Sequence, residues 1–326
     1  MPRTMIDIGC KLALLTAALV ERRLSIVYFH RVPAMQDPLL PGEPDCARFR
    51  ARVRWLRDGF HVLPLVDAVR RLYAGTLPPR ALAITFDDGY RDNVTNALPI
   101  LTELGVPATF FVTTRYLDGG MMWNDRVIEA LRAWPGEDID LTPYGLESFT
   151  LRGARVTALP GLLEKLKYLP HAAREHAASD LLARSGATVS GLMANADEIR
   201  RLRAAGMEVG GHTVSHPILC SLPLAEARDE IATNKAELEA ILGEPVVCFA
   251  YPNGRPGQDF AAEHCGLLAE LGYEFALTTA AGTADRRTPR FQIPRFSPWD
   301  DSEAKYLGRL VMNYFRRAAY LDEAAA

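Results

Sequence analysis

Two adjacent carboxylates follow an apolar segment in the first third of the chain. Asp87 and Asp88 come directly after residues 81–86 (ALAITF) and are followed by Gly89. At the end of a buried strand both carboxylates would lose hydration, and their like charges would oppose the ionisation of both. A bound cation would relieve both penalties. Because Asp-Asp-Gly is also a common turn sequence, this pair alone leaves metal chemistry and a plain turn open.

A pair of histidines follows another apolar segment much later in the chain. His212 and His216 are separated by three residues, a spacing that predicts a helical turn with both imidazoles on one side. Such a pair often lies on the surface or caps a helix. Together with one aspartate it supplies three protein ligands and leaves a position open for water, as a catalytic metal site requires. Thr213 and Ser215 are expected to bind the backbone and orient the two rings.

Short apolar segments alternate with helical patterns and would place both motifs. The predicted strands are residues 24–30, 61–65, 81–88, 108–114, 207–212, 246–252, 274–280 and 291–296, and predicted helices include 48–59, 92–105 and 223–243. Most strand segments are continuously apolar, which is typical of strands covered on both faces. The alternation predicts an α/β fold, a distorted (β/α) barrel of about seven strands, with the catalytic residues at the carboxyl ends of its strands.

One domain is expected to span residues 1–326, with two additions to the barrel. Residues 119–196 contain no clear strand and predict a mostly helical insertion, which either shapes substrate access or elaborates one loop. Residues 302–317 predict a C-terminal helix that docks on the body of the protein. Residues 12–20 are apolar but too short to cross a bilayer, and we interpret them as an N-terminal helix rather than a signal peptide.

Composition excludes several classes of function. The net charge of −3 gives no electrostatic basis for nucleic-acid binding. The five cysteines are scattered without a CxxC pair, so they predict neither a disulfide framework nor a cysteine zinc site. No residues around Cys220 or Cys248 support a cysteine hydrolase. With no membrane span predicted, a cytoplasmic location is favoured and the cell envelope is the alternative, while the oligomeric state stays open.

The two motifs together resemble a known family. Residues 85–89 (TFDDG) and 212–216 (HTVSH) are similar to the first two motifs of the NodB-type polysaccharide deacetylases, carbohydrate esterase family four, and the resemblance covers about 24–118 and 197–296. It implies that Asp87 is the general base and that Asp88, His212 and His216 bind one divalent metal ion. Zinc is the expected metal, with cobalt and nickel as alternatives.

The third motif of the family is altered in this chain. Residues 250–254 (AYPNG) resemble it, but Ala250 replaces the arginine that steadies the base and Asn253 replaces a tyrosine. The backbone N–H of Asn253 is still expected to bind the oxyanion, because a backbone donor does not depend on the side chain. Arg295 is the predicted replacement for the missing arginine and is also expected to contact substrate.

The general acid of the family, a histidine near the C-terminus, is absent because no histidine follows His264. His30 closes the predicted strand 24–30 and would lie at the same rim as Asp87. Deacetylases of poly-N-acetylglucosamine, whose motifs are circularly permuted, have a similar N-terminal histidine, and the resemblance implies His30 as the general acid. A capping or core histidine is the alternative.

These residues predict a metal-dependent hydrolase that removes N-acetyl groups from an N-acetylated polysaccharide or oligosaccharide. Tyr90, Tyr251 and Trp299 are expected to stack on the sugar, with ordinary packing as the alternative. Two other functions stay open. One is a deacylase or deformylase of a lipid-linked or small amide substrate, and the other is a sugar-binding module without catalytic activity.

Overall fold

The computed structural model describes residues 22–151, 153 and 155–321. Its centre is a seven-stranded sheet in the order β1-β3-β4-β7-β8-β9, with β2 also paired to β3, and every pairing is parallel. The strands are β1 (Leu24–Phe29), β2 (His61–Val62), β3 (Ala81–Phe86), β4 (Thr109–Val112), β7 (Glu208–Gly211), β8 (Cys248–Ala250) and β9 (Phe275–Leu277).

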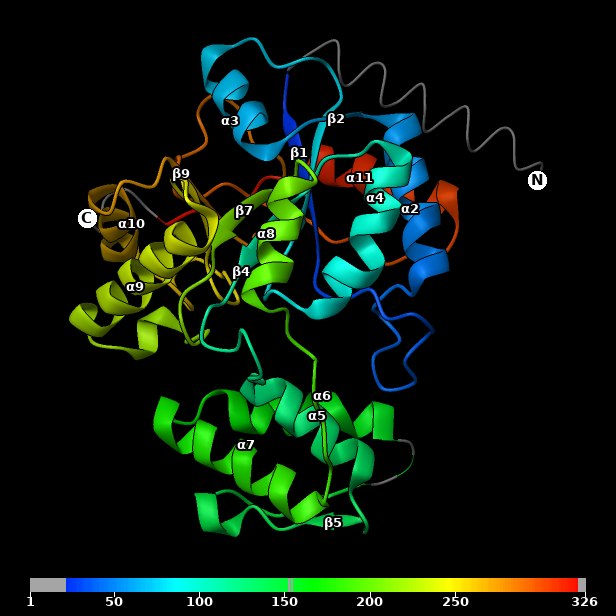
Figure 1. Ribbon diagram of the computed structural model, residues 1–326, viewed down its shortest axis with the longest axis vertical. Coiled ribbons are helices and arrows are strands. Elements are labelled where there is room, and N and C mark those ends of the chain that lie inside the picture. The colour runs from blue at the N-terminus through cyan, green and yellow to red at the C-terminus, as the bar shows by residue number, and fades with distance from the viewer. Residues whose placement is uncertain (1–21, 152, 154, 322–326) are drawn as a thin grey trace.

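Helices cover the outer face of the curled sheet (Figure 1). Successive strand residues point to opposite faces, so Ile26 joins one apolar cluster and Val27 another. The Val27 cluster lies under the outer helices, whereas the Ile26 cluster fills the inner face and is completed by α3. The helices of the body are α2 (Cys46–Gly59), α3 (Leu65–Ala74), α4 (Leu98–Leu104), α8 (Ala196–Ala204), α9 (Leu224–Leu242), α10 (Ala262–Glu270) and α11 (Glu303–Tyr314), with short turns at η1 (Asn93–Ala97) and η3 (Leu219–Ser221).

The predicted distorted α/β barrel of about seven strands is confirmed, but residues 291–296 do not form its last strand. They make two isolated parallel bridges, Leu277 with Ile293 and Val27 with Phe296. Pro294 between them has no N–H to donate to a ladder, which explains why the pairing does not extend. The segment still connects β9 to β1 and thereby carries Arg295 across the barrel.

Two predicted helices differ in detail from the structure. The segment 92–105 begins with the π-helical turn η1, in which the Asn93 side chain donates to the carbonyl of His30, and continues as α4 to a left-handed Gly105. The predicted C-terminal helix is α11, which buries Tyr306 and Leu310 against the body. The helix predicted at 12–20 lies outside the described residues.

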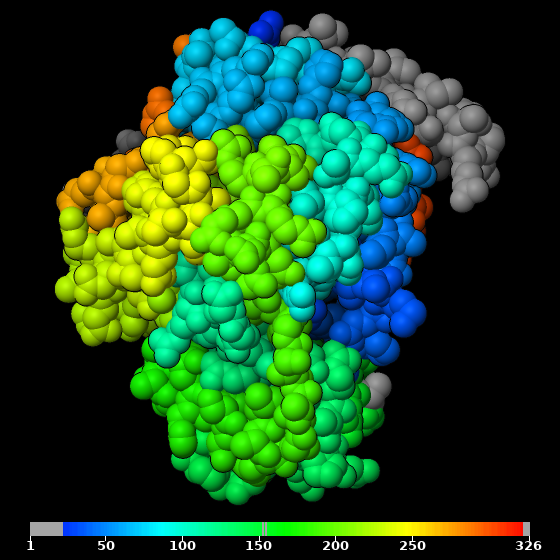
Figure 2. All heavy atoms as spheres, in the orientation of Figure 1, coloured from blue at the N-terminus to red at the C-terminus, as the bar shows by residue number. Residues whose placement is uncertain are grey.

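The insertion forms a separate lobe at the end of the sheet opposite α3 (Figure 1), packed directly against the rest of the molecule (Figure 2). Its helices are α5 (Trp123–Ala133), α6 (Arg155–Lys167) and α7 (His171–Ser185), and they share an apolar cluster of their own. No strand was expected in this segment, and that expectation is wrong in detail. Two short strands, β5 (Asp138–Ile139) and β6 (Phe149–Thr150), pair antiparallel around η2 (Thr142–Tyr144). Within the described part of the chain no helix has the length and apolar character needed to cross a bilayer.

The close packing of β7 gives a testable prediction. A Cβ at Gly210 would lie 2.4 Å from the Phe111 ring and 2.9 Å from the carbonyl oxygen of Cys248. Because that oxygen belongs to the backbone and Phe111 is fully buried, we expect Gly210→Ala to lower the free energy of unfolding by about 1–3 kcal/mol in urea denaturation. Gly266→Ala in α10 is the control, since its Cβ would meet open space. Equal stability of the two variants would contradict this packing.

Candidate active site

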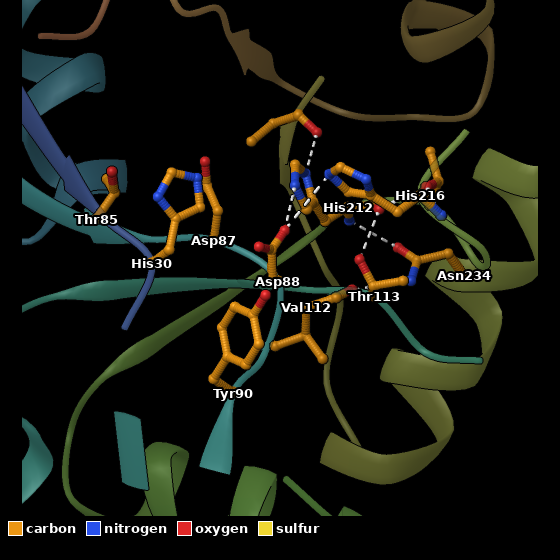
Figure 3. A network of polar contacts seen from close by, with 12 residues as sticks. His30, Thr85, Asp87, Asp88, Tyr90, Val112, Thr113, His212, His216 and Asn234 are labelled. Atoms are coloured by element: carbon orange, nitrogen blue, oxygen red, sulfur yellow. Dashed lines mark hydrogen bonds and ion pairs between the residues drawn. The ribbon is translucent and has the colours of Figure 1, made fainter. Parts of the chain in front are cut away.

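The turn after β3 directs two neighbouring carboxylates to different partners. Asp88 and Gly89 have φ angles of 79° and 88°, a left-handed conformation that is strained for aspartate. Asp88 points toward His212 and His216, whereas Asp87 lies on the side of His30 (Figure 3). Both aspartates are almost fully buried. The backbone conformation therefore gives each carboxylate its own environment, although the two are adjacent in sequence.

The turn after β7 positions the two histidines, but it is not the expected helical turn. Thr213 and His216 have φ angles of 64° and 57°. The turn is held by the N–H of His216, which donates to Thr213 Oγ1 at 3.1 Å. Ser215 donates through its N–H and its hydroxyl to the two carboxylate oxygens of Glu230 in α9, at 2.8 and 2.6 Å. The Thr213 side chain thus binds the backbone of this turn as expected, whereas the Ser215 hydroxyl binds the Glu230 carboxylate instead of the backbone.

Three ligand atoms converge at one point. His212 Nε2 and His216 Nε2 lie 3.3 and 3.4 Å from Asp88 Oδ1, and all three atoms are within 4.8 Å of one another. Ligands bound about 2.0–2.2 Å from a tetrahedral zinc ion would be separated by roughly such distances. Asp88 Oδ1 is buried and accepts no hydrogen bond. An acceptor in this state, faced by two imidazoles, fits a divalent cation.

The protonation states also suit a metal ligand set. His212 Nδ1 lies 2.7 Å from the carbonyl oxygen of Ala250, so the proton is assigned to Nδ1 and Nε2 stays free. Burial lowers the pKa of His216 to about 4, which leaves its imidazole neutral near pH 7. Burial alone would raise the pKa of Asp88, but His212, His216 and His30 lower it below its ordinary value.

Asn234 is a buried residue behind the histidines that the sequence analysis did not identify. Its Oδ1 accepts from the His212 N–H at 3.0 Å, and its Nδ2 donates to the carbonyl of Val112 at 3.0 Å. It therefore ties the end of β7 to the end of β4. The available signal was an asparagine on the apolar stripe of a helix, between Ile231 and Leu238, where an amide needs partners.

Asp87 is paired with an arginine from residues 291–296, the segment that connects β9 to β1. Arg295 donates to both carboxylate oxygens, at 2.7 and 2.9 Å, and has no exposed surface. Its Nε donates to the carbonyl of Thr278, and its guanidinium lies 4.9 Å from the centre of the Tyr28 ring. Burial would raise the pKa of Asp87, but Arg295 and the nearby histidines lower it. Arg295 does not line the pocket, contrary to the expectation that it contacts substrate.

The carboxyl ends of the strands and the insertion enclose a pocket of about 550 Å³. His30, Asp87 and His212 each follow the last residue of a strand and line it together. The barrel side also includes Tyr28, Asp88, Tyr90, His216, Asn253 and Thr279, and the insertion contributes Asn124, Asp125, Ile128, Leu163 and Lys167. Catalytic residues at the carboxyl ends of strands, beneath variable loops, are typical of α/β barrels.

His30 lines this pocket, with 41% of its side chain exposed and Nδ1 3.9 Å from Glu43 Oε1. Burial would lower its pKa, but the carboxylates of Asp88, Glu43 and Asp87 outweigh this and raise it. The raised pKa favours the imidazolium form, which can donate a proton.

The other predicted residues divide into two groups. Asn253 lines the pocket in a left-handed turn, and among the described residues none accepts a hydrogen bond from its N–H. Tyr90 also lines the pocket, and its hydroxyl donates to Asp125 Oδ1 at 3.0 Å. Tyr251 does not reach the pocket, because it is buried in the core and stacks on Phe260 at 3.8 Å. A side chain in this position does not contact a substrate in the pocket, contrary to the expectation.

Trp299 likewise lies outside the pocket. It is 58% exposed, and it lines a separate surface groove together with Phe296 and Arg309. This position is therefore inconsistent with the expectation that Trp299 stacks on a sugar at the catalytic centre. Asn124 and Asp125, which the sequence analysis did not identify, occupy the pocket wall instead.

Comparison with known proteins identifies the family. The sequence profile described as "Polysaccharide deacetylase" matches residues 74–276. A putative polysaccharide deacetylase, YxkH of Bacillus subtilis, is 21% identical over 275 residues, which is 84% of this chain and 70% of that protein.

Solved structures agree with the fold. The deacetylase PplD of Streptococcus pyogenes in complex with acetate superimposes with a TM-score of 0.60 at 17% identity, covering 88% of this chain and 97% of that one. IcaB from Ammonifex degensii gives a TM-score of 0.58 at 19% identity, covering 88% and 96%. With the family profile matching more than half of its length, this chain belongs to the polysaccharide deacetylase family.

Proposed function

We propose that this protein is a metal-dependent hydrolase that removes N-acetyl groups from an N-acetylated saccharide. The observation that carries this proposal is the convergence of Asp88, His212 and His216 on one point, with Asp87 beside them in the same pocket. Two imidazoles and one carboxylate are a common zinc set, and cobalt and nickel accept the same ligands. A bound ion of this kind supplies a Lewis acid for the acetyl carbonyl and lowers the pKa of water.

The residues of the chain would then handle the protons and the developing charge. Asp87 accepts a proton from the attacking water, using a lone pair that the two Arg295 hydrogen bonds leave free. The Asn253 N–H donates to the carbonyl oxygen as it becomes negative. His30 donates a proton to the departing nitrogen. The water oxygen bonds to the carbonyl carbon, the C–N bond breaks, and acetate and a free amine result.

The metal site and the base are tested by acetate release from N-acetylated chito-oligosaccharides. We expect a chelator to abolish activity and zinc, cobalt or nickel to restore it. His212→Ala should lose both metal and activity, whereas Asp87→Asn should keep the metal and lower kcat by about a hundredfold or more. Asp229→Asn, at an exposed position of α9, is the control. Parent-like rates in both site variants would exclude the mechanism, and saccharide binding without acetate release would indicate a binding module.

Arg295 is proposed as a positioning residue that acts through Asp87. Removing the guanidinium leaves a buried carboxylate unpaired, so Arg295→Met should cost about 3–5 kcal/mol of unfolding free energy. The cost should be clearly smaller in an Asp87→Asn background, because the amide carries no charge. Arg295→Met should also lower kcat in the parent but not further in the Asp87→Asn variant. Additive effects on both stability and kcat would show that the two residues act independently.

The proposed role of His30 predicts a dependence on the leaving group. His30→Gln should lower kcat for an N-acetylated saccharide by about 10²–10⁴, the usual contribution of a general acid. The loss should be much smaller for 4-nitrophenyl acetate, whose leaving group departs without a proton. His61→Gln, at an exposed histidine of β2, serves as the control. An equal loss on both substrates would assign His30 a different role.

A further inference from the structure

We propose that Asn124 and Asp125, in the first turn of α5, form a subsite that hydrogen-bonds to hydroxyl groups of the saccharide carrying the acetyl group. This inference rests on the proposed deacetylase function. It assigns the insertion a part in substrate selection that is separate from the catalytic chemistry of the barrel.

The two residues line the same pocket as the candidate active site. α5 begins at Trp123, so Asn124 and Asp125 are its second and third residues, and both line the pocket that contains Asp87 and His216. A saccharide whose acetyl group reached the barrel rim would therefore have part of its surface against this turn of α5. Positioning of the non-reacting part of a substrate in this way contributes strongly to catalysis.

Polar atoms in this wall are buried without partners. Asp125 is 2% exposed, and its Oδ1 accepts from the Tyr90 hydroxyl, whereas its Oδ2 has no hydrogen-bond partner. Asn124 Oδ1 is also buried and unpaired. Leaving such atoms unpaired is unfavourable. Sugar hydroxyls both donate and accept, so a saccharide is a ligand that could satisfy the two neighbouring atoms.

In the described part of the chain, no ion pair compensates for the burial of the Asp125 carboxyl group. Arg31, whose charge acts on Asp125, pairs instead with Asp92 at 2.9 Å. Burial raises the pKa of Asp125 to about 7, with Arg31 lowering and Asp88 raising it. Near neutral pH the carboxyl group is therefore partly protonated, and Oδ2 can donate to a sugar oxygen or accept from a sugar hydroxyl.

A second metal site does not fit these residues. Among residues 22–151, 153 and 155–321, Asp88, His212 and His216 form the one group of three or more histidine, cysteine or acidic ligands close enough to hold an ion. The insertion side of the pocket also contains Ile128, Leu163 and Lys167, of which the first two offer apolar surface to the C–H face of a sugar ring. A mixed apolar and polar lining is typical of sites for small neutral ligands.

The test compares two substrates of the metal-loaded enzyme, N,N′-diacetylchitobiose and 4-nitrophenyl acetate. Asp125→Asn is nearly isosteric and keeps an acceptor for Tyr90, and Asn124→Ala truncates a partly exposed side chain. In each variant, we expect kcat/KM for the saccharide to fall about tenfold more than kcat/KM for the ester, as for loss of one buried hydrogen bond. Asp180→Asn in α7, outside the pocket, is the matched control and should leave the ratio unchanged.

The outcomes separate this inference from the proposed function. If the parent enzyme releases acetate from the saccharide but neither variant changes the ratio of the two kcat/KM values, the subsite is excluded and the deacetylase proposal stands. If the metal-loaded parent releases no acetate from either substrate, both proposals are overturned. Thermal unfolding of each variant, compared with the parent, separates a lost contact from a lost fold.

Discussion

Two buried carboxylates on consecutive residues must be stabilised separately, and much of the structure serves this requirement. The φ angle of 79° at Asp88 turns its side chain away from that of Asp87. Asp87 then meets Arg295, which is supplied by the segment that connects β9 to β1. Asp88 meets two imidazoles from the turn after β7, and its buried Oδ1 has no hydrogen-bond partner. The barrel brings these three segments together because two of them directly follow β3 and β7, and the third connects β9 to β1.

The elements that could be predicted are those with a local signal. Continuous apolar runs mark strands buried on both faces, and residues that directly follow such strands must share one edge of the sheet, which is why Asp88 and His212 were expected to meet. The conformation of residues 212–216 could not be predicted in this way. Thr213 and His216 have positive φ angles in a turn that is held by a local bond to Thr213 Oγ1 and by Glu230 of α9, whereas the spacing of the histidines alone suggested a helical turn.

Long-range contacts were harder to predict. Arg295 was named as a replacement for the missing arginine, but its complete burial behind Asp87 depends on how residues 291–296 cross the barrel. Tyr251 was expected to stack on the sugar, yet this residue directly after β8 turns its side chain into the core, where it stacks on Phe260. No sequence pattern indicated Asp125 as a site residue, because its burial arises where the insertion packs on the barrel.

Backbone strain is concentrated at the same rim. Six described residues other than glycine have positive φ angles, and four of them, Asp88, Thr213, His216 and Asn253, belong to the candidate site. Each such residue costs about 1–3 kcal/mol and persists only where its surroundings enforce the conformation. The bonds that enforce it are found here: the His216 N–H donates to Thr213 Oγ1, and the Thr279 hydroxyl donates to the carbonyl of Asn253.

Hydrogen bonds that enforce these backbone conformations hold Asp88, His212 and His216 in fixed positions relative to one another, which is the kind of preorganisation that the proposed function needs. The insertion adds a second wall to the pocket at this rim. If the proposed function holds, the barrel supplies the reacting groups and the insertion contacts the remainder of the substrate, as is common where loops vary on a conserved scaffold.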